Sequence, residues 1–271
     1  MSAVALTVAG SDPSGGAGVQ ADLKTFAAHG VYGTSVLTAL TAQNTRGVRG
    51  VHVVPAGFVA QQLDAVLDDV TVHATKIGML ADAGVVAAVA AAVRSRDVGR
   101  VVLDPVMVAT SGDRLLDPAA VAALREDLLP LADLVTPNVP EAAVLLDAEP
   151  ARDLDGCRAQ ARELFARSGT TVLLKGGHLT GADSVDVLVG DAGELLLRRP
   201  RVDTTATHGT GCTLSSALAA QAALHPGAGW EQLADPARDY LQAALRAGAA
   251  LRVGSGHGPL DHAFALREDR P

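Results

Sequence analysis

The amino-acid sequence predicts an α/β fold in which a mostly parallel β-sheet is covered by helices on both faces. Two observations lead to this prediction. Short runs rich in valine and leucine alternate with longer alanine-rich helical patterns, and the short runs are apolar throughout rather than alternately polar. Strands that are buried on both faces have this composition. Because 48% of the residues are hydrophobic and no repeat or linker divides them, we expect residues 1–271 to form a single domain.

In the first half of the chain, each strand-like run is bounded by Gly, Asp or Pro, and each helical pattern is rich in alanine. The expected strands are Ala3–Ala9, Thr34–Thr41, Val51–Val54, Val72–Ile77 and Val101–Leu103, and the expected helices are about Ala17–His29, Phe58–Leu67 and Ala83–Ser95.

The second half continues the alternation and adds a hairpin. Its expected strands are Leu134–Val135 and Thr171–Leu174, and its expected helices are Pro118–Leu128, Glu141–Leu146, Asp155–Arg167, Thr213–Leu224 and Asp235–Arg252. Val185–Val189 and Glu194–Leu197 flank Asp191-Ala192-Gly193, which predicts a hairpin turn. A tail rich in glycine and proline ends the chain.

The composition limits the classes of function. A net charge of −8 argues against a nucleic-acid partner or an anionic membrane surface. The longest purely apolar run, Val85–Val93, is too short to span a bilayer. Cys157 and Cys212 are the only cysteines and form no CxxC motif, which is typical of a reducing cytoplasm, and the N-terminus lacks a basic signal-peptide start. We therefore expect a cytoplasmic protein.

Polar or glycine-rich segments follow the predicted strands at several places. In open α/β sheets, ligands bind at the carboxyl ends of the strands. The candidate chemistry follows this rule at Gly10-Ser11-Asp12, Gln43-Asn44, Gly78-Met79, Asp104, Asn138–Glu141, Lys175-Gly176-Gly177 and Gly209–Cys212. The agreement among these places indicates one ligand site more strongly than any single motif.

The segment Asp203–Ala220 turns through Gly209 and Gly211 and then enters a helical pattern. Small residues leave backbone N–H groups open where a helix begins, and these groups hold anions such as phosphate. Cys212 lies on the first turn, where the same field favours a thiolate. The segment is typical of phosphoryl transfer, although a glycine-rich turn with a packed cysteine has the same pattern.

Asp104, Glu141 and Lys175 are the charged candidates. Phosphoryl transfer uses Mg²⁺, which binds carboxylates and water, so Asp104 and Glu141 are candidate metal ligands. Each also has an ordinary interpretation, as a strand-ending turn and as a helix N-terminal charge. Lysine is scarce, with Lys24, Lys76 and Lys175 against nineteen arginines. Lys175 precedes two glycines and could reach phosphate oxygens, unless it is a solvated strand end.

The remaining candidates are loop and strand-end residues. Gly10–Asp22 is the most glycine-dense loop, and it either folds over a small substrate or forms a flexible turn; its G-x-G-x-x-A match is weak. The amide of Gln43 matches the ring-nitrogen and amino edge of an aminopyrimidine, or caps backbone. Met79 is an apolar wall or core. His178 and His208 show no acidic partner and are interpreted as hydrogen-bonding loop residues.

Taken together, these segments resemble the bacterial hydroxymethylpyrimidine/phosphomethylpyrimidine kinases of thiamine biosynthesis. The resemblance runs from Val4 to about Pro259, on residues 10–22, 41–48, 76–80, 103–108, 136–142, 175–178 and 207–215. It implies a ribokinase-like, three-layer α/β/α sandwich, with two ATP-dependent phosphorylations of a pyrimidine. It also implies a homodimer.

The resemblance implies roles for individual residues. The pyrimidine-binding glutamine falls on Gln43, the anion hole and catalytic cysteine on Gly209, Thr210, Gly211 and Cys212, the metal and phosphate acids on Asp104 and Glu141, and the phosphate lysine on Lys175. We further expect Gly10, Asp12, Met79 and Val106 to contact substrate, and Thr205 to contact nucleotide.

One departure and two alternatives remain. Family members often carry Ala-Lys-Ser-Gly where this chain has Ala109-Thr110-Ser111-Gly112, so no role is carried over to Thr110. A pyridoxal kinase of the same fold is the nearest alternative, because both ring substrates carry hydroxymethyl groups. A non-catalytic small-molecule sensor is the other alternative, but Asp104, Glu141 and Cys212 are all retained.

Overall fold

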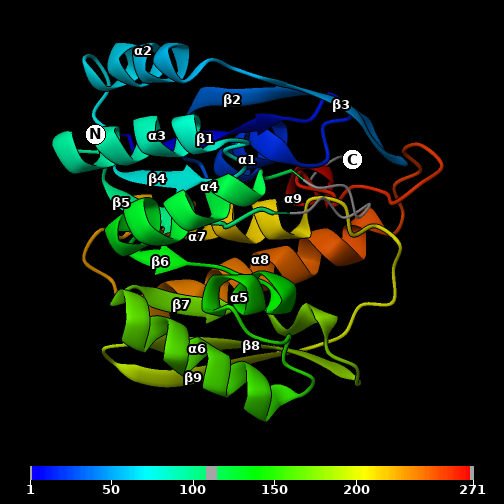
Figure 1. Cartoon of the computed structure of the whole chain (residues 1–271). Helices are drawn as coiled ribbons and strands as arrows, with labels where there is room; N and C mark the ends of the chain where they lie inside the picture. Colours follow the sequence, from blue (N-terminus) through cyan, green and yellow to red (C-terminus); the bar gives the residue numbers. More distant parts are fainter. Residues whose placement is uncertain (1, 108–114, 269–271) are drawn as a thin grey trace.

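The computed structural model describes residues 2–107 and 115–268, which include a nine-stranded sheet (Figure 1). The strands are β1 (Val4–Ser11), β2 (Tyr32–Asn44), β3 (Gly47–Val53), β4 (Ala74–Ile77), β5 (Arg100–Leu103), β6 (Leu134–Val135), β7 (Thr171–Leu174), β8 (Asp183–Gly190) and β9 (Gly193–Pro200). Their order across the sheet is β3-β2-β1-β4-β5-β6-β7-β8-β9.

The centre of the sheet is parallel and its two edges are antiparallel. β2, β1, β4, β5, β6 and β7 pair in parallel, so their carboxyl ends meet at one edge. β3 pairs antiparallel with β2, and β8 and β9 form the predicted hairpin beside β7. The predicted mostly parallel sheet is confirmed.

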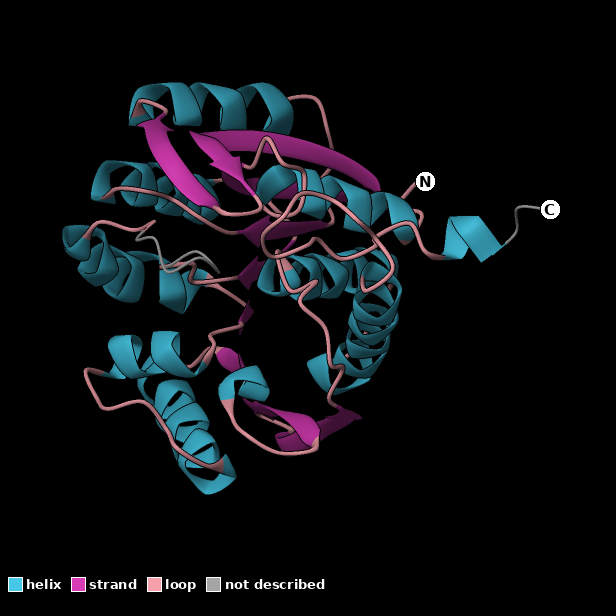
Figure 2. Ribbon diagram, turned by 90° about the vertical axis from the view of Figure 1, so that its right-hand side faces the viewer, coloured by secondary structure: helices cyan, strands magenta, loops and turns pink. Residues whose placement is uncertain are grey.

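Helices cover both faces of the sheet, which gives the three-layer sandwich seen edge-on in Figure 2. One layer contains α2 (Ala56–Leu67), α3 (Ala83–Ser95), α4 (Pro118–Ala123), α5 (Val139–Leu146) and α6 (Leu154–Ser168). The other contains α1 (Gly18–Ala28), α7 (Thr210–Leu224) and α8 (Trp230–Gly248). The tail expected to be irregular also forms a short helix, α9 (Ala265–Glu268).

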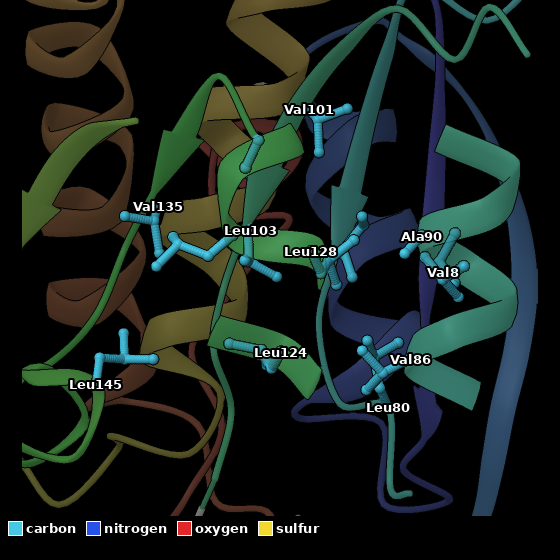
Figure 3. Close-up of a cluster of buried hydrophobic side chains, with 14 of the residues drawn as sticks. Val8, Leu80, Val86, Ala90, Val101, Leu103, Leu124, Leu128, Val135 and Leu145 are labelled. Carbon is cyan, nitrogen blue, oxygen red and sulfur yellow. The ribbon is translucent and has the colours of Figure 1, made fainter. Parts of the chain in front are cut away.

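Apolar strand residues divide between two cores because successive side chains point to opposite faces. Val101 and Leu103 of β5 pack in the larger core against α3 and the segment after α4 (Figure 3), whereas Val102 between them packs against α7. Burying a Val or Leu side chain stabilises the fold by roughly 1.5–3 kcal/mol. Strands with two buried faces therefore require the unbroken apolar runs seen in the sequence.

Helix α7 packs on the sheet and against both α1 and α8 of the same layer, so it is buried on nearly all sides. Its alanines, among them Ala217 and Ala220, have no exposed surface. Small side chains let the helix approach β1, β4 and β5 closely, and the N-terminus of the helix is thereby fixed at the carboxyl edge of the sheet.

Two predicted helices differ from the structure. α8 begins at Trp230, not Asp235, and holds Pro236 inside it, because Trp230 and Leu233 are buried in the second core and Arg100 stacks 3.8 Å from the Trp230 ring centre. The predicted helix Pro118–Leu128 is α-helical only to Ala123 and continues as a π-helical turn, Leu124–Leu128. Pro130 follows, and its ring conflicts with regular α-geometry in the preceding turn. None of the described helices is both long and apolar enough to cross a bilayer.

Candidate functional site

A cavity of about 640 Å³ opens at the carboxyl edge of the sheet, in front of the N-terminus of α7. Twelve of the thirteen predicted site residues meet there. The predicted residues that line it are Gly10, Asp12, Gln43, Met79, Asp104, Val106, Glu141, Lys175, Gly209, Thr210, Gly211 and Cys212. Thr205 is exposed and does not line this cavity. The segment around Thr110 lies outside the described residues.

The N-terminus of α7 approaches the glycine-rich loop after β1 so closely that only glycine fits. Gly209 has φ +88°, and a Cβ there would lie 1.8 Å from the carbonyl oxygen of Gly16. Gly18 has φ +57°, and a Cβ there would lie 2.4 Å from the carbonyl oxygen of Gly10, so it too must be glycine. No side chain caps α7, and although the Thr210 N–H donates to the Thr207 carbonyl, the N–H groups of Gly211 and Cys212 make no hydrogen bond within the described residues and can receive an anion.

The glycine-rich loop is held by Asp12 and is not a flexible turn. The Asp12 carboxylate accepts hydrogen bonds from the backbone N–H groups of Ser14, Gly16 and Ala17 at 2.9–3.1 Å. His208 Nε2 lies 2.7 Å from its Oδ2, so the expectation that His208 has no acidic partner is wrong. Burial by itself would raise the pKa of Asp12, but the hydrogen bonds from His208 and Ser14 lower it to about 2.

A buried ion pair below the cavity was not predicted. Lys76 on β4 and Asp22 on α1 have no exposed surface, and Lys76 Nζ lies 2.9 Å from Asp22 Oδ2. The hydroxyls of Thr7 and Ser216 also donate to Asp22. Burial would lower the pKa of Lys76, but Asp22 raises it above its usual value, so the ammonium keeps its charge. The sequence signal was present: a scarce lysine inside an apolar strand.

Cys212 lies on the first turn of α7, as predicted, and is half-buried at the cavity wall. The expectation that the helix field favours its thiolate is contradicted. Desolvation raises the pKa of Cys212 to about 11, with Asp22 and Asp104 acting in the same direction, while Lys76 and the Gly18 N–H oppose it. The thiol therefore keeps its proton at neutral pH in the ligand-free protein.

Asp104, Lys175 and Glu141 form a charged group beside the α7 N-terminus, where a Cβ on Gly211 would lie 3.2 Å from Lys175 Nζ. Lys175 Nζ lies 2.9 Å from Asp104 Oδ1 and 3.9 Å from Glu141 Oε2. Glu141 also accepts the Asn138 N–H in a capping box at the start of α5. Burial raises the pKa of Glu141 to about 7 despite Lys175, whereas Lys175 and Lys76 overcome burial and lower the pKa of Asp104.

The remaining wall of the cavity is less charged. Gln43, at the end of β2, accepts a hydrogen bond from Thr41 at 3.1 Å through Oε1. Its side-chain nitrogen makes no hydrogen bond within the described part of the chain. Met79 and Val106 add apolar surface, and a Cβ on Gly10 would lie 3.0 Å from the Met79 sulfur. This wall suits a flat, partly polar ring.

A second cavity of about 170 Å³ adjoins the first on the side of β8, β9 and α8. The two cavities share Lys175, Gly177, Thr207 and Thr210. Val202, Leu241 and Leu245 give the second cavity an apolar side. Thr204, not the predicted Thr205, lines it.

The family model described as phosphomethylpyrimidine kinase matches residues 12–261. The hydroxymethylpyrimidine/phosphomethylpyrimidine kinase of Salmonella typhimurium is 53% identical over 261 residues, which cover 96% of this chain and 97% of that protein. A thiamine biosynthesis multifunctional protein of Corynebacterium efficiens is 54% identical over 263 residues and 96% of this chain, but the match spans only 35% of that longer protein.

A solved structure shows the same fold. The ADP complex of Bacillus subtilis pyridoxal kinase superposes with a TM-score of 0.89 at 35% identity, over 98% of this chain and 99% of that one. The expected ribokinase-like architecture is confirmed.

Proposed function

Because the chain belongs to the phosphomethylpyrimidine kinase family, we propose that it transfers phosphate from ATP to the hydroxymethyl group of hydroxymethylpyrimidine, and then a second phosphate to the monophosphate. The chain is a kinase. In the first step the substrate oxygen forms a bond to the γ-phosphorus, the bond to ADP breaks, and the hydroxyl loses its proton. The second step repeats this transfer on a phosphate oxygen.

One arrangement carries the proposal: the ring-type and the phosphate-type residues of the cavity come from different parts of the sheet edge. Gln43 and Met79 are carried by β2 and the end of β4, whereas Asp104 and Lys175 follow β5 and β7 further along the sheet. A ring held by the first two residues can present its hydroxymethyl group to a phosphate held by the other two. Such positioning removes much of the entropic part of the barrier.

The ring is placed by one polar and two apolar contacts. The Gln43 amide pairs with a ring nitrogen and the amino group of the pyrimidine. Met79 and Val106 cover the ring faces. This set distinguishes an aminopyrimidine from a ring without the paired donor and acceptor, because an unmatched buried amide costs free energy.

The transferred phosphate is held by the open N–H groups of Gly211 and Cys212 and by the Lys175 ammonium. Both stabilise the negative charge on the phosphate oxygens in the transition state. Cys212 accepts the hydroxyl proton. Its thiolate is scarce at neutral pH, but a base of high pKa is correspondingly stronger, and a loose transition state releases the proton late.

A magnesium ion is part of the proposal. Within the described residues, no group of three or more His, Cys, Asp or Glu side chains could hold a metal by itself. Mg²⁺ is usually bound by one or two carboxylates together with substrate phosphates and water, so Asp104 and Glu141 fit an ion that arrives with ATP. Bound there, the ion would neutralise phosphate charge, and Lys175 would exchange its contact with Asp104 for phosphate oxygens.

We place the adenosine part of ATP over the second cavity. It adjoins the phosphate side through Lys175, Gly177, Thr207 and Thr210, and Leu241 and Leu245 offer the base an apolar surface. The predicted nucleotide contact through Thr205 has no support from this geometry, since Thr205 is exposed and lines neither cavity.

A coupled assay of ATP consumption tests the function. We expect turnover with the pyrimidine alcohol and with its monophosphate, and turnover with pyridoxal that is slower by at least about tenfold in kcat/KM, from the amide contact. The likeness to pyridoxal kinase makes pyridoxal the necessary comparison. If pyridoxal were the better substrate, the pyrimidine assignment would be wrong and the pyridoxal alternative would replace it.

Gln43→Ala serves as the matched variant in this assay. It should raise the pyrimidine KM by roughly 10- to 100-fold and leave the ATP KM unchanged. A variant that changed only the ATP KM would remove Gln43 from the substrate site.

A homodimer and a cytoplasmic location complete the proposal. Leu40 on β2, Val51 on β3 and Phe58 on α2 are exposed apolar side chains near the β3 end of the sheet. Covering them in a second copy would remove this apolar surface from water. Both cysteines are free thiols, which suits the reducing cytoplasm. Sedimentation of the wild type and of Val51→Glu would test the dimer: a wild-type monomer at working concentration contradicts it.

A further inference from the structure

A second buried ion pair lies beneath the turn that carries Lys175. Arg238 on α8 and Asp186 on β8 are each 3% exposed, and Arg238 Nε lies 2.7 Å from Asp186 Oδ2. The proposed reaction uses neither residue. Retaining two charges in a protein interior is costly unless their hydrogen bonds are well satisfied, so the contacts of this pair indicate what it holds in place.

The second oxygen of Asp186 holds the Lys175 turn. Asp186 Oδ1 accepts the N–H of Gly176, the residue after Lys175, at 2.9 Å. The turn lies directly on β8, because a Cβ on Gly176 would lie 1.9 Å from the Val185 carbonyl oxygen. The Lys175 N–H donates to the Pro137 carbonyl at 2.8 Å. The backbone on both sides of Lys175 is therefore fixed.

Arg238 connects this turn to the second cavity. Its Nη2 donates to Ser184 at 2.9 Å and its Nη1 to Gln242 at 3.3 Å, and Gln242 donates to the Pro200 carbonyl at 2.6 Å. Arg238, Gln242 and Asp186 line the second cavity, together with Lys175 and Gly177. The ion pair thus lies between the cavity where we place adenosine and the lysine that we assign to phosphate.

We propose that Asp186, oriented by Arg238, is a positioning residue that holds the Lys175–Gly177 turn in place for ATP. The proposal rests on the proposed function, since that function places the nucleotide over the second cavity. A charge-assisted hydrogen bond from Arg238 Nε fixes Oδ2 of the carboxylate, and Oδ1 fixes the backbone next to Lys175. A shift of the turn would move the Lys175 ammonium away from the phosphate and alter the wall that the two cavities share.

The test compares Asp186→Asn with Arg199→Gln. Asparagine keeps the size of the side chain but loses the charge that binds Arg238. Arg199 also joins the hairpin to α8, through Asp235 and Asp239, but it does so on the surface and does not touch the turn. We expect Asp186→Asn to raise the ATP KM about tenfold or more and to leave the pyrimidine KM within twofold, while Arg199→Gln changes neither.

Two further measurements separate positioning from a merely structural role. Arg238→Lys keeps a charge but loses the planar fork, so it should raise the ATP KM in the same direction by a smaller factor. Titration with AMP-PCP, which is not turned over, should show nucleotide affinity falling from the wild type to Arg238→Lys to Asp186→Asn. This measurement needs no second substrate, so it tests the proposal even if the pyrimidine is not the substrate. If Asp186→Asn and Arg238→Lys only lower the melting temperature, with nucleotide affinity and KM within twofold of wild type, the proposal is overturned.

Discussion

The carboxyl edge of the sheet and the outer surface use charged residues in opposite ways. At the carboxyl edge, charges are almost completely buried and bridge elements that are distant in sequence, as in Lys76–Asp22, Lys175–Asp104 and Arg238–Asp186. On the surface, the pairs are exposed, as in Arg96–Asp64, Arg96–Asp68, Arg158–Asp155 and Arg198–Asp183. The distances are similar in both regions, so distance does not separate them.

The two regions differ in how far water reaches the charged side chains. An exposed pair gains little because water screens its charges, with a typical contribution of about 0–1 kcal/mol. A buried pair has lost its hydration, and removing one partner leaves a charge without compensation, at about 3–5 kcal/mol. The pairs at the carboxyl edge should therefore be far more sensitive to substitution than those on the surface. The substitutions below test this contrast, from the largest expected effect to the smallest.

Cys212→Ala should have the largest effect, and on rate rather than on stability. Loss of the proton acceptor is expected to lower kcat by ~10²–10⁴-fold while the ATP KM stays within a few-fold, because the backbone at Gly209–Gly211 is unchanged. In the proposed mechanism the thiolate accepts the proton, and the thiol pKa is about 11, so the wild-type kcat should rise with pH through the neutral range. This rise should be absent in the variant. Steady-state kinetics between about pH 6 and 9 measure both the loss of kcat and its dependence on pH. A near-wild-type kcat in the variant would show that Cys212 is only a packing residue.

Lys76→Met tests the buried side of the comparison directly. Methionine has a similar length but no charge, so the buried Asp22 carboxyl loses its ammonium partner and the free energy of unfolding should fall by about 3–5 kcal/mol. Urea denaturation measures the loss. The double variant Lys76→Met/Asp22→Asn should recover part of it, because no buried charge remains. Equal stability of Lys76→Met and the wild type would show that this pair behaves like a surface pair.

Asp12→Asn should destabilise the protein by about 2 kcal/mol at neutral pH, which corresponds to the difference between the ordinary pKa of 3.8 and about 2. The folded-state pKa is lowered, so the stabilisation is complete above pH ~4 and is lost as the pH falls through ~2. Unfolding measured across this range should show the two proteins converging at acid pH. A difference that did not depend on pH would assign the effect to packing instead of charge.

Arg96→Gln should have the smallest effect. Its partners Asp64 and Asp68 are 63% and 69% exposed in their side chains, so the free energy of unfolding should change by less than about 1 kcal/mol. The same urea denaturation measures it beside Lys76→Met. If Arg96→Gln lowered the free energy of unfolding as much as Lys76→Met does, buried and exposed pairs would not differ in their contribution to stability.

Much of the fold and of the site could be predicted from the sequence, because both follow local rules. Apolar runs such as Val101–Leu103 and Thr171–Leu174 identify buried strands, and the helix Ala83–Ser95 was placed without error. Parallel strands end at a common edge, so the residues that follow them were expected to meet, and Gln43, Asp104, Lys175 and Cys212 do line one cavity. Their roles in binding and catalysis remain predictions.

The tertiary structure alone decided the pairings and the state of the thiol. Lys76 and Asp22 are 54 residues apart, and His208 and Asp12 are 196 apart, so no local pattern connects them. The start of α8 was set by the burial of Trp230, which overrides the usual limit at Pro236. The helix start fixed where Cys212 lies, whereas its pKa depends on desolvation by segments brought together from the whole chain. A sequence records which side chains are available, but the dielectric and the partners around each charge exist only once the sheet has formed.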